Sequence, residues 1–268
     1  MKKVLNCLLA AILVCSTSVF TSCKSNDDDN QSDLNLSKKI IGKWIVTELD
    51  GQACPTNLKT VVTIESPTKA YGSLSDIYSD SWNVRAEADV KITGNKIYMT
   101  TKDDDNVSHV LETTVSSITD TYMLLKSEWT AYLDDKQLLH EAYAQERWER
   151  VTVDYQNDII GMWEGKVSSA EDANSDSELH RWEYKADGTY AYYSEGGGTW
   201  IRSDDVLSEY FVDGPLLCTR WKNSADSKEI REWWEIESIQ NGVMKWKALR
   251  MRDNGTTYTT TFEMKKVQ

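Results

Sequence analysis

The chain has 268 residues, and 40% of them are hydrophobic, which is enough for one large core or two small ones. It contains 11 Trp and 13 Tyr but only three Phe and three Pro, and this surplus of Trp and Tyr favours β-strands. The formal net charge is −13. Such an acidic chain argues against nucleic-acid binding, because phosphate contacts need a basic surface.

The N-terminal segment 1–22 has the organisation of a secretory signal peptide. Lys2 and Lys3 precede the apolar stretch VLNCLLAAILVCSTSVF, and small residues follow it. Polar residues interrupt this stretch, and it is short for a membrane-spanning helix, so a retained membrane anchor is only the alternative. Two lysines and no acidic residue would leave with this segment, which makes the mature chain more acidic still.

The end of this segment, Phe20-Thr21-Ser22-Cys23, resembles the lipobox of bacterial lipoproteins, although Phe replaces the usual Leu. The resemblance implies that Cys23 is diacylated and binds outer-membrane lipid, and two acyl chains anchor a protein stably. Residues 23–37 contain KSNDDDNQSD, which cannot bury apolar surface and is expected to form a solvated tether. This acidic stretch resembles the signal that directs Bacteroidetes lipoproteins to the cell exterior. A soluble leader is the alternative.

Two copies of one domain are predicted from an internal repeat. The stretches IIGKW and IIGMW place Gly42 and Gly161 119 residues apart, each two residues before a Trp. Later segments follow in the same order and at matched spacing, including LETTVSSITDTYMLL and EWWEIESIQNGVMKW. Such order over five segments indicates duplication. The predicted domains are residues 38–154 and 157–268.

Each copy is expected to be an antiparallel β-meander. Residues 82–92 alternate between apolar and polar, and Gly94-Asn95 can form the turn that follows. In the second copy, Asp187-Gly188 is a strong hairpin signal. Residues 135–145 could form a short helix, but the repeat places part of them in the last strand. A meander with one apolar face must close into a barrel or pack on another sheet.

The Gly-x-Trp opening strands, the Asp-Gly-Thr-Tyr hairpin and the Gly-Thr-Trp strand resemble the short lipocalin-like domains of Bacteroidetes lipoproteins. The resemblance covers both copies, although the first lacks the hairpin. It implies an all-β fold of two tandem antiparallel lipocalin-like β-barrels after a signal peptide and tether. It also implies that Trp44 and Trp163 close the barrel bottoms, with Arg250 as the basic side chain over Trp163. Gly42 and Gly161 would allow close backbone approach.

No catalytic arrangement is recognisable, and we expect no enzyme and no cofactor. The chain has three His, none close to another, and it lacks Gly-x-Ser-x-Gly, His-Glu-x-x-His and phosphate-binding loops. A carboxylate pair for glycoside hydrolysis could occur among the 43 acidic residues, but no pattern identifies one.

One loop has the ligand spacing of a Ca²⁺ site. Its oxygen ligands would stand at positions 1, 3, 5, 7 and 12 of the loop: Asp172, Asn174, Asp176, Glu178 and Glu183. Ser occupies position 6, where Gly normally makes the sharp turn, and no helices flank the loop. A chance match in an acidic surface loop is therefore the favoured interpretation.

Aromatic residues crowd the second copy, and most are in phase with its apolar face, so they are expected to fill its core. Tyr193, Phe211 and Trp233 fall on the opposite face. There they could contact a ligand by stacking on sugar rings, or form the contact between the two barrels, which is favoured for Trp233. Cys54 and Cys218 are expected to be buried free thiols.

These observations predict a non-catalytic lipoprotein of the outer membrane that faces the cell exterior and binds a small ligand or a partner there. A carbohydrate-binding accessory role in glycan capture is one alternative. A structural or adhesive module without a small ligand is the other.

Overall fold

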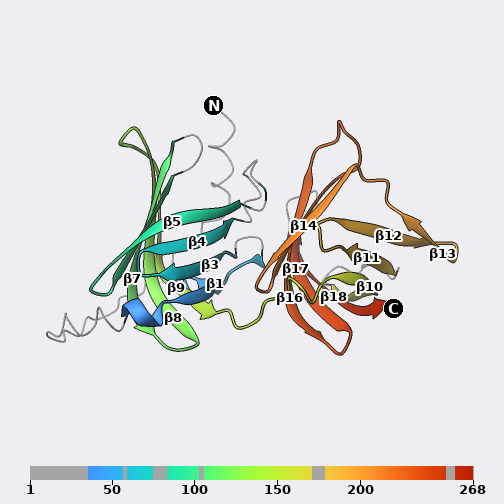
Figure 1. Cartoon of the computed structure of the whole chain (residues 1–268), viewed down its shortest axis with the longest axis horizontal. Coiled ribbons are helices and arrows are strands. Elements are labelled where there is room, and N and C mark those ends of the chain that lie inside the picture. Colours follow the sequence, from blue (N-terminus) through green and yellow to red (C-terminus); the bar gives the residue numbers. More distant parts are fainter. Residues whose placement is uncertain are drawn as a thin grey trace.

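The computed structural model describes residues 36–56, 59–74, 82, 84–102, 106–170, 179–251 and 257–267. The described residues form two antiparallel β-sheets, one from each copy of the repeat, which lie side by side (Figure 1). This confirms the predicted all-β meander fold. Segments 1–22 and 23–35, with Cys23, lie outside the described residues. The described helices include none that is long and apolar enough to cross a membrane.

The first sheet closes into an eight-stranded barrel. Its order is β2-β1-β3-β4-β5-β6-β7-β8-β9, and β9 pairs back onto β1, which leaves β2 as a short extension. The stretch 135–145 belongs largely to β9, so the short-helix alternative is wrong. The strands are β1 (Gly42–Leu49), β2 (Gln52–Ala53), β3 (Val61–Ser66), β4 (Lys69–Leu74), β5 (Val84–Thr93), β6 (Lys96–Lys102), β7 (Ser108–Ile118), β8 (Tyr122–Leu133) and β9 (Lys136–Arg150).

The second sheet curls into a half-barrel, in the order β13-β12-β11-β10-β18-β17-β16-β15-β14. Among the described residues its two ends meet at a single bridge, Thr189 to Glu209, because β13 folds back onto β12 and not onto β14. The strands are β10 (Gly161–Ala170), β11 (His180–Tyr184), β12 (Tyr190–Gly196), β13 (Thr199–Arg202), β14 (Leu207–Asp213), β15 (Leu216–Lys222), β16 (Ile230–Gln240), β17 (Val243–Met251) and β18 (Thr257–Val267).

The Gly-x-Trp tryptophans seal one end of each sheet. Trp44 and Trp163 are fully buried, and each indole N–H donates to the carbonyl four residues earlier, at 2.7 Å to Ile40 and 2.6 Å to Ile159. The two isoleucines are also fully buried, and each ends a turn of chain that packs under its sheet. The same plug is therefore built twice.

A cation from the last strand covers each plug. The Arg150 guanidinium lies 4.2 Å from the centre of the Trp44 ring, and the Lys266 ammonium lies 5.1 Å from that of Trp163. The prediction of Arg250 over Trp163 is therefore corrected. Lys266 is the direct cross-strand partner of Trp163, whereas Arg250 pairs with Tyr258, eight residues away along β18.

The first barrel packs against the outer face of β14, β15 and β16. Ile45 and Val61 form a small apolar cluster with Leu216 of the second sheet. The Lys43 ammonium lies 2.7 Å from the Asp213 carboxylate, and the Lys59 ammonium lies 2.6 Å from that of Glu235. Because Lys59 and Glu235 have side chains only 10% and 16% exposed, the contact excludes most water from this ion pair.

Glu235→Ala is expected to destabilise the protein by about 3 kcal/mol, because it leaves the nearly buried Lys59 ammonium without this carboxylate. Urea unfolding measures the loss. Glu237→Ala on the same strand is the control: the Glu237 side chain is 43% exposed, and removal of its ion pair with Lys247 should cost less than about 1 kcal/mol. Equal losses in the two variants would contradict a buried ion pair between the first barrel and the second sheet.

Candidate functional site

A layer of buried polar side chains crosses the inside of the first barrel, above its apolar core. Thr113 on β7 and Ser127 on β8 are each 1% exposed, and Glu146 on β9 is 5% exposed. Thr113 and Ser127 are direct cross-strand partners, and the Ser127 hydroxyl donates to the Glu146 carboxylate. Three neighbouring strands thus bring one acidic and two hydroxyl side chains together in adjacent rows of the barrel interior.

The Glu146 carboxylate is held by neutral donors. Ser127 donates to one of its oxygens, and the Trp148 indole N–H donates to the other. Burial raises the pKa of Glu146, and the negative charge of Asp50 raises it further. The hydrogen bonds from Ser127 and Trp148 lower this pKa but do not offset the burial. No cationic side chain among the described residues pairs with the carboxylate.

Three more side chains line the inner wall from the level of Ser127 to the barrel end opposite the plug. Tyr143 is the direct partner of Ser127, and Glu141 is the direct partner of Trp129. Directly opposed residues of antiparallel strands share a face, so these side chains point inward like Ser127. Tyr143, Glu141 and Trp129 are nevertheless only half-buried. Solvent therefore reaches the inner wall from this end, which we call the rim.

The second sheet carries apolar side chains at the positions of the polar layer. The plug registers, Trp44 with Arg150 and Trp163 with Lys266, align the two sheets strand by strand. Met123 then corresponds to Met244, since each pairs with the last strand two residues before the plug cation. Counting along the strands from these points matches Thr113, Ser127 and Glu146 with Trp234, Ala248 and Phe262.

Aromatic rings pack against one another inside the second sheet. Trp234 stacks on Trp246 with ring centres 4.9 Å apart, and Phe262 lies edge-on to Trp182 at 5.6 Å. Tyr184 is 1% exposed, and burial raises its pKa well above its ordinary value. The alternation of the sequence predicts this aromatic core. The second sheet keeps other polar side chains on its inner face, such as Thr219 and Thr260, but a buried carboxylate at the position of Glu146 is particular to the first barrel, and the fold can be built without it.

Two of the three aromatic ligand-contact candidates lie toward the contact between the first copy of the repeat and the second sheet. Phe211 on β14 meets Trp82 of the first copy edge-on, with ring centres 5.0 Å apart. Trp233 is 8% exposed and lies in the same cross-strand row through Cys218. Tyr193 is half-buried on β12 and donates its hydroxyl to Glu183 at 3.2 Å.

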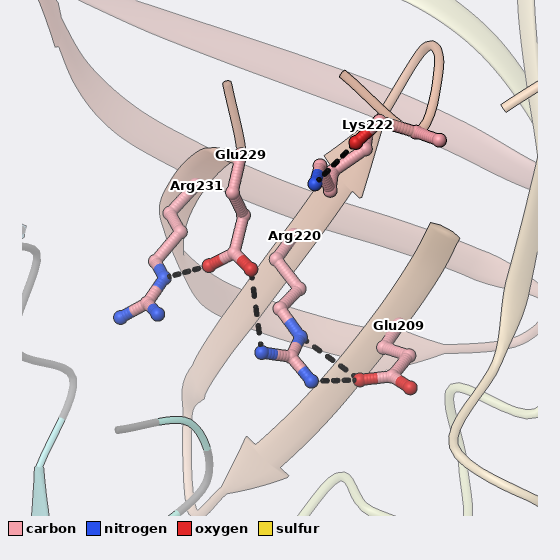
Figure 2. Close-up of polar contacts among 6 residues, drawn as sticks. Glu209, Arg220, Lys222, Glu229 and Arg231 are labelled. Carbon is pink, nitrogen blue, oxygen red and sulfur yellow. Dashed lines mark hydrogen bonds and ion pairs between the residues drawn. The ribbon is translucent and has the colours of Figure 1, made fainter. Parts of the chain in front are cut away.

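An ion-pair network supports Trp82 at this contact. The Arg220 guanidinium lies 4.7 Å from the centre of the Trp82 ring. Figure 2 shows that Arg220 bridges the carboxylates of Glu209 and Glu229, and that Arg231 holds the other oxygen of Glu229. The outer face of β14–β16 is thus organised to bind the first copy of the repeat.

The predicted Ca²⁺ loop lies largely outside the described residues, which exclude Asp172, Asn174, Asp176 and Glu178. Its fifth residue, Glu183, lies on β11. Within the described part of the chain, no three His, Cys, Asp or Glu side chains gather as a metal site.

Both cysteines of the described chain are free and buried. Burial raises the pKa of the Cys54 thiol to about 12. Burial also raises that of Cys218 well above its ordinary value.

Comparisons with known proteins identify no family for this chain. No protein family matches its sequence, and no curated protein is similar to it. Among solved structures it is similar to a protein of unknown function from the DUF3598 family of Nostoc punctiforme, with 12% sequence identity and a TM-score of 0.29. That alignment covers 88% of this chain and 99% of the other. A similarity this low supports no functional inference.

The sequence patterns did not point to the polar layer, although one signal was available. In QERWERV, Glu146 is two residues before Trp148 and therefore in phase with the apolar face of a strand. Thr113 and Ser127 have no such mark, because Thr and Ser occur on both faces of strands. Only the strand register brings the three together.

Glu146→Gln is expected to flatten the pH dependence of stability. The pKa of Glu146 is raised in the folded state, so its favourable contribution is complete below the unfolded value near 4.5 and is lost as pH rises through the folded pKa. As the pH rises through the folded pKa of Glu146, the free energy of unfolding of the variant should therefore increase relative to that of the native protein. Urea unfolding between pH 4 and pH 8 measures the difference.

Glu128→Gln provides a control of opposite sign on the outer face of β8. A hydrogen bond from Lys126 lowers the pKa of the exposed Glu128, so its contribution is present above the unfolded value and is lost in acid. The Glu128 variant should lose stability relative to the native protein as pH rises. The same trend in both variants would contradict the environment described for Glu146.

Proposed function

We propose that the protein is a non-catalytic binding protein, anchored through lipid on Cys23 at the outer face of an outer membrane, and that its first barrel holds a small ligand. One observation carries the ligand site. Thr113, Ser127 and Glu146 form a buried polar layer where the second sheet has apolar and aromatic residues.

The polar layer is costly for folding. A buried carboxylate that lacks a cation destabilises a protein, and the second sheet shows that apolar residues fit the same positions. Perturbed pKa values also concentrate at functional sites. A polar layer that folding does not require, beneath a half-exposed inner wall, is best explained by a ligand that enters from the rim.

The two copies of the repeat then have different roles. Aromatic rings fill the interior of the second sheet, and its outer face packs on the first barrel. It therefore serves as a support, and the first barrel binds. Binding is favoured over catalysis because Glu146 is fixed by Ser127 and Trp148, while His109 stacks on Trp129 nearer the rim.

Glycan capture by the outer aromatic face is a weaker alternative. Phe211 packs on Trp82 and Trp233 is buried, so Tyr193 is the remaining half-exposed member of that set. The lipocalin-like resemblance of the sequence likewise points to the barrel interior as the binding site. An interior site needs no exposed aromatic strip.

The ligand site is tested with the chain from residue 24 and a variant whose polar layer copies the second sheet, Ser127→Ala with Glu146→Phe. We expect compounds from a metabolite library to raise the melting temperature of the native chain but not that of this variant. Thr260→Val, inside the second sheet, is the control and should keep the shift. Shifts in melting temperature that are the same in the native chain, the double variant and Thr260→Val would contradict a site at Glu146.

The location is tested in intact cells. Protease added to intact cells should degrade the native protein. Without protease, the protein should be found in the membrane fraction and should be solubilised by detergent. Cys23→Ala should no longer fractionate with the membrane, because it lacks the acylated side chain. Protection of the native protein from external protease would contradict an outward-facing position.

A further inference from the structure

The inner wall above the polar layer is acidic. The inward-facing positions of β7, β8 and β9 from this layer to the rim carry two carboxylates, Glu141 and Glu146, and no Lys or Arg. Glu146 is 5% exposed, and Glu141 is half-buried nearer the rim. On these three strands a ligand that enters from the rim therefore meets negative charge at two depths, with no inward-facing lysine or arginine beside it.

The Glu146 carboxylate has unused hydrogen-bonding capacity. Its two oxygens offer about four acceptor positions, and the side chains of Ser127 and Trp148 use one on each oxygen. Both donors are neutral, so the negative charge itself is not compensated. A cationic donor would form the stronger, charge-assisted hydrogen bond and would also offset the burial of the charge.

Aromatic rings line the path to this carboxylate. Tyr143 lies directly across from Ser127, and Trp129 lies directly across from Glu141. Burial raises the pKa of Tyr143 to about 12, and the nearby charges of Glu141 and Glu146 add to this rise. Rings next to carboxylates are a common setting for ammonium groups, since the ring face attracts a cation.

We infer that the ligand of the first barrel is a small organic amine, whose protonated nitrogen pairs with Glu146 while its apolar body packs against Trp129 and Tyr143. This inference rests on the proposed function. A fatty acid or another anion is disfavoured, because its carboxylate would face Glu141 and Glu146. A neutral alcohol can accept and donate hydrogen bonds but leaves the buried charge uncompensated.

Three probes of one shape separate these possibilities: 2-phenylethylamine, 2-phenylethanol and phenylacetate. Calorimetric titration of the chain from residue 24 at pH 7.5 measures each affinity. We expect the amine to bind at least about tenfold more tightly than the alcohol, and phenylacetate not to bind, since one charge-assisted hydrogen bond accounts for such a ratio.

Glu146→Gln should weaken amine binding by about tenfold or more and leave alcohol binding unchanged. Glu128→Gln, on the outer face of β8, is the matched control and should bind the amine as the native chain does. An unfolding curve for each variant confirms that the fold is intact. Quenching of tryptophan fluorescence by the amine, from Trp129 and Trp148, provides a second readout.

The inference fails if the amine and the alcohol bind equally, or if Glu146→Gln and Glu128→Gln have equal effects. In either case binding that is lost in the Ser127→Ala, Glu146→Phe variant would still support a ligand site in the first barrel. If the amine does not bind the native chain at all, the amine inference is overturned. The proposed function is then decided separately by the library screen.

Discussion

The buried tryptophan of each Gly-x-Trp motif is the interaction on which both sheets depend. Its indole donates to a carbonyl four residues earlier, and a cation from the last strand lies over the ring. One side chain thus fixes the entry of the chain and the register between the first and last strands. Gly42 and Gly161 stand at positive φ values of 134° and 126°, where a Cβ would meet Arg150 or Lys266.

Two sheets built on the same plug have different interiors. In the first, β9 runs from Lys136 to Arg150 and pairs with both β8 and β1, which completes the barrel. In the second, β13 turns back on β12, and the aromatic rings supply the core of a sheet that is not closed by strand pairing. The second sheet also has half-buried inner side chains, such as Trp182 and Tyr192, but it has Phe262 where the first barrel buries the Glu146 carboxylate.

The local patterns of the sequence predicted much of this fold. The period-two alternation, the Asp187-Gly188 turn and the repeated Gly-x-Trp stretch gave the strands and the duplication, since each depends on neighbouring residues. Lys266 over Trp163 was not predicted, because it depends on pairing between strands about 100 residues apart in sequence. Phe211 likewise meets Trp82 across the two copies, and periodicity within one strand carries no information about such a contact.

The polar layer escaped prediction for a related reason. An acidic residue in an acidic chain is normally assigned to the surface, and Glu146 becomes unusual only when the register places Ser127 and Trp148 against its carboxylate. The structure therefore identifies Glu146 as an inward-facing acid, which the sequence alone does not do. It also shows that the equivalent position in the second copy is Phe262.

The plug also orients the molecule. Leu36, where the described chain begins, packs in the same core cluster as Ile40 and Trp44, so the chain enters the first barrel at its sealed end. A tether from Cys23 to Leu36 spans at most about 45 Å when fully extended. A lipid on Cys23 would then keep the sealed end toward the membrane and the rim toward the surrounding medium. The open end of the first barrel, and not its plug, would then be the part of the protein that molecules outside the cell encounter.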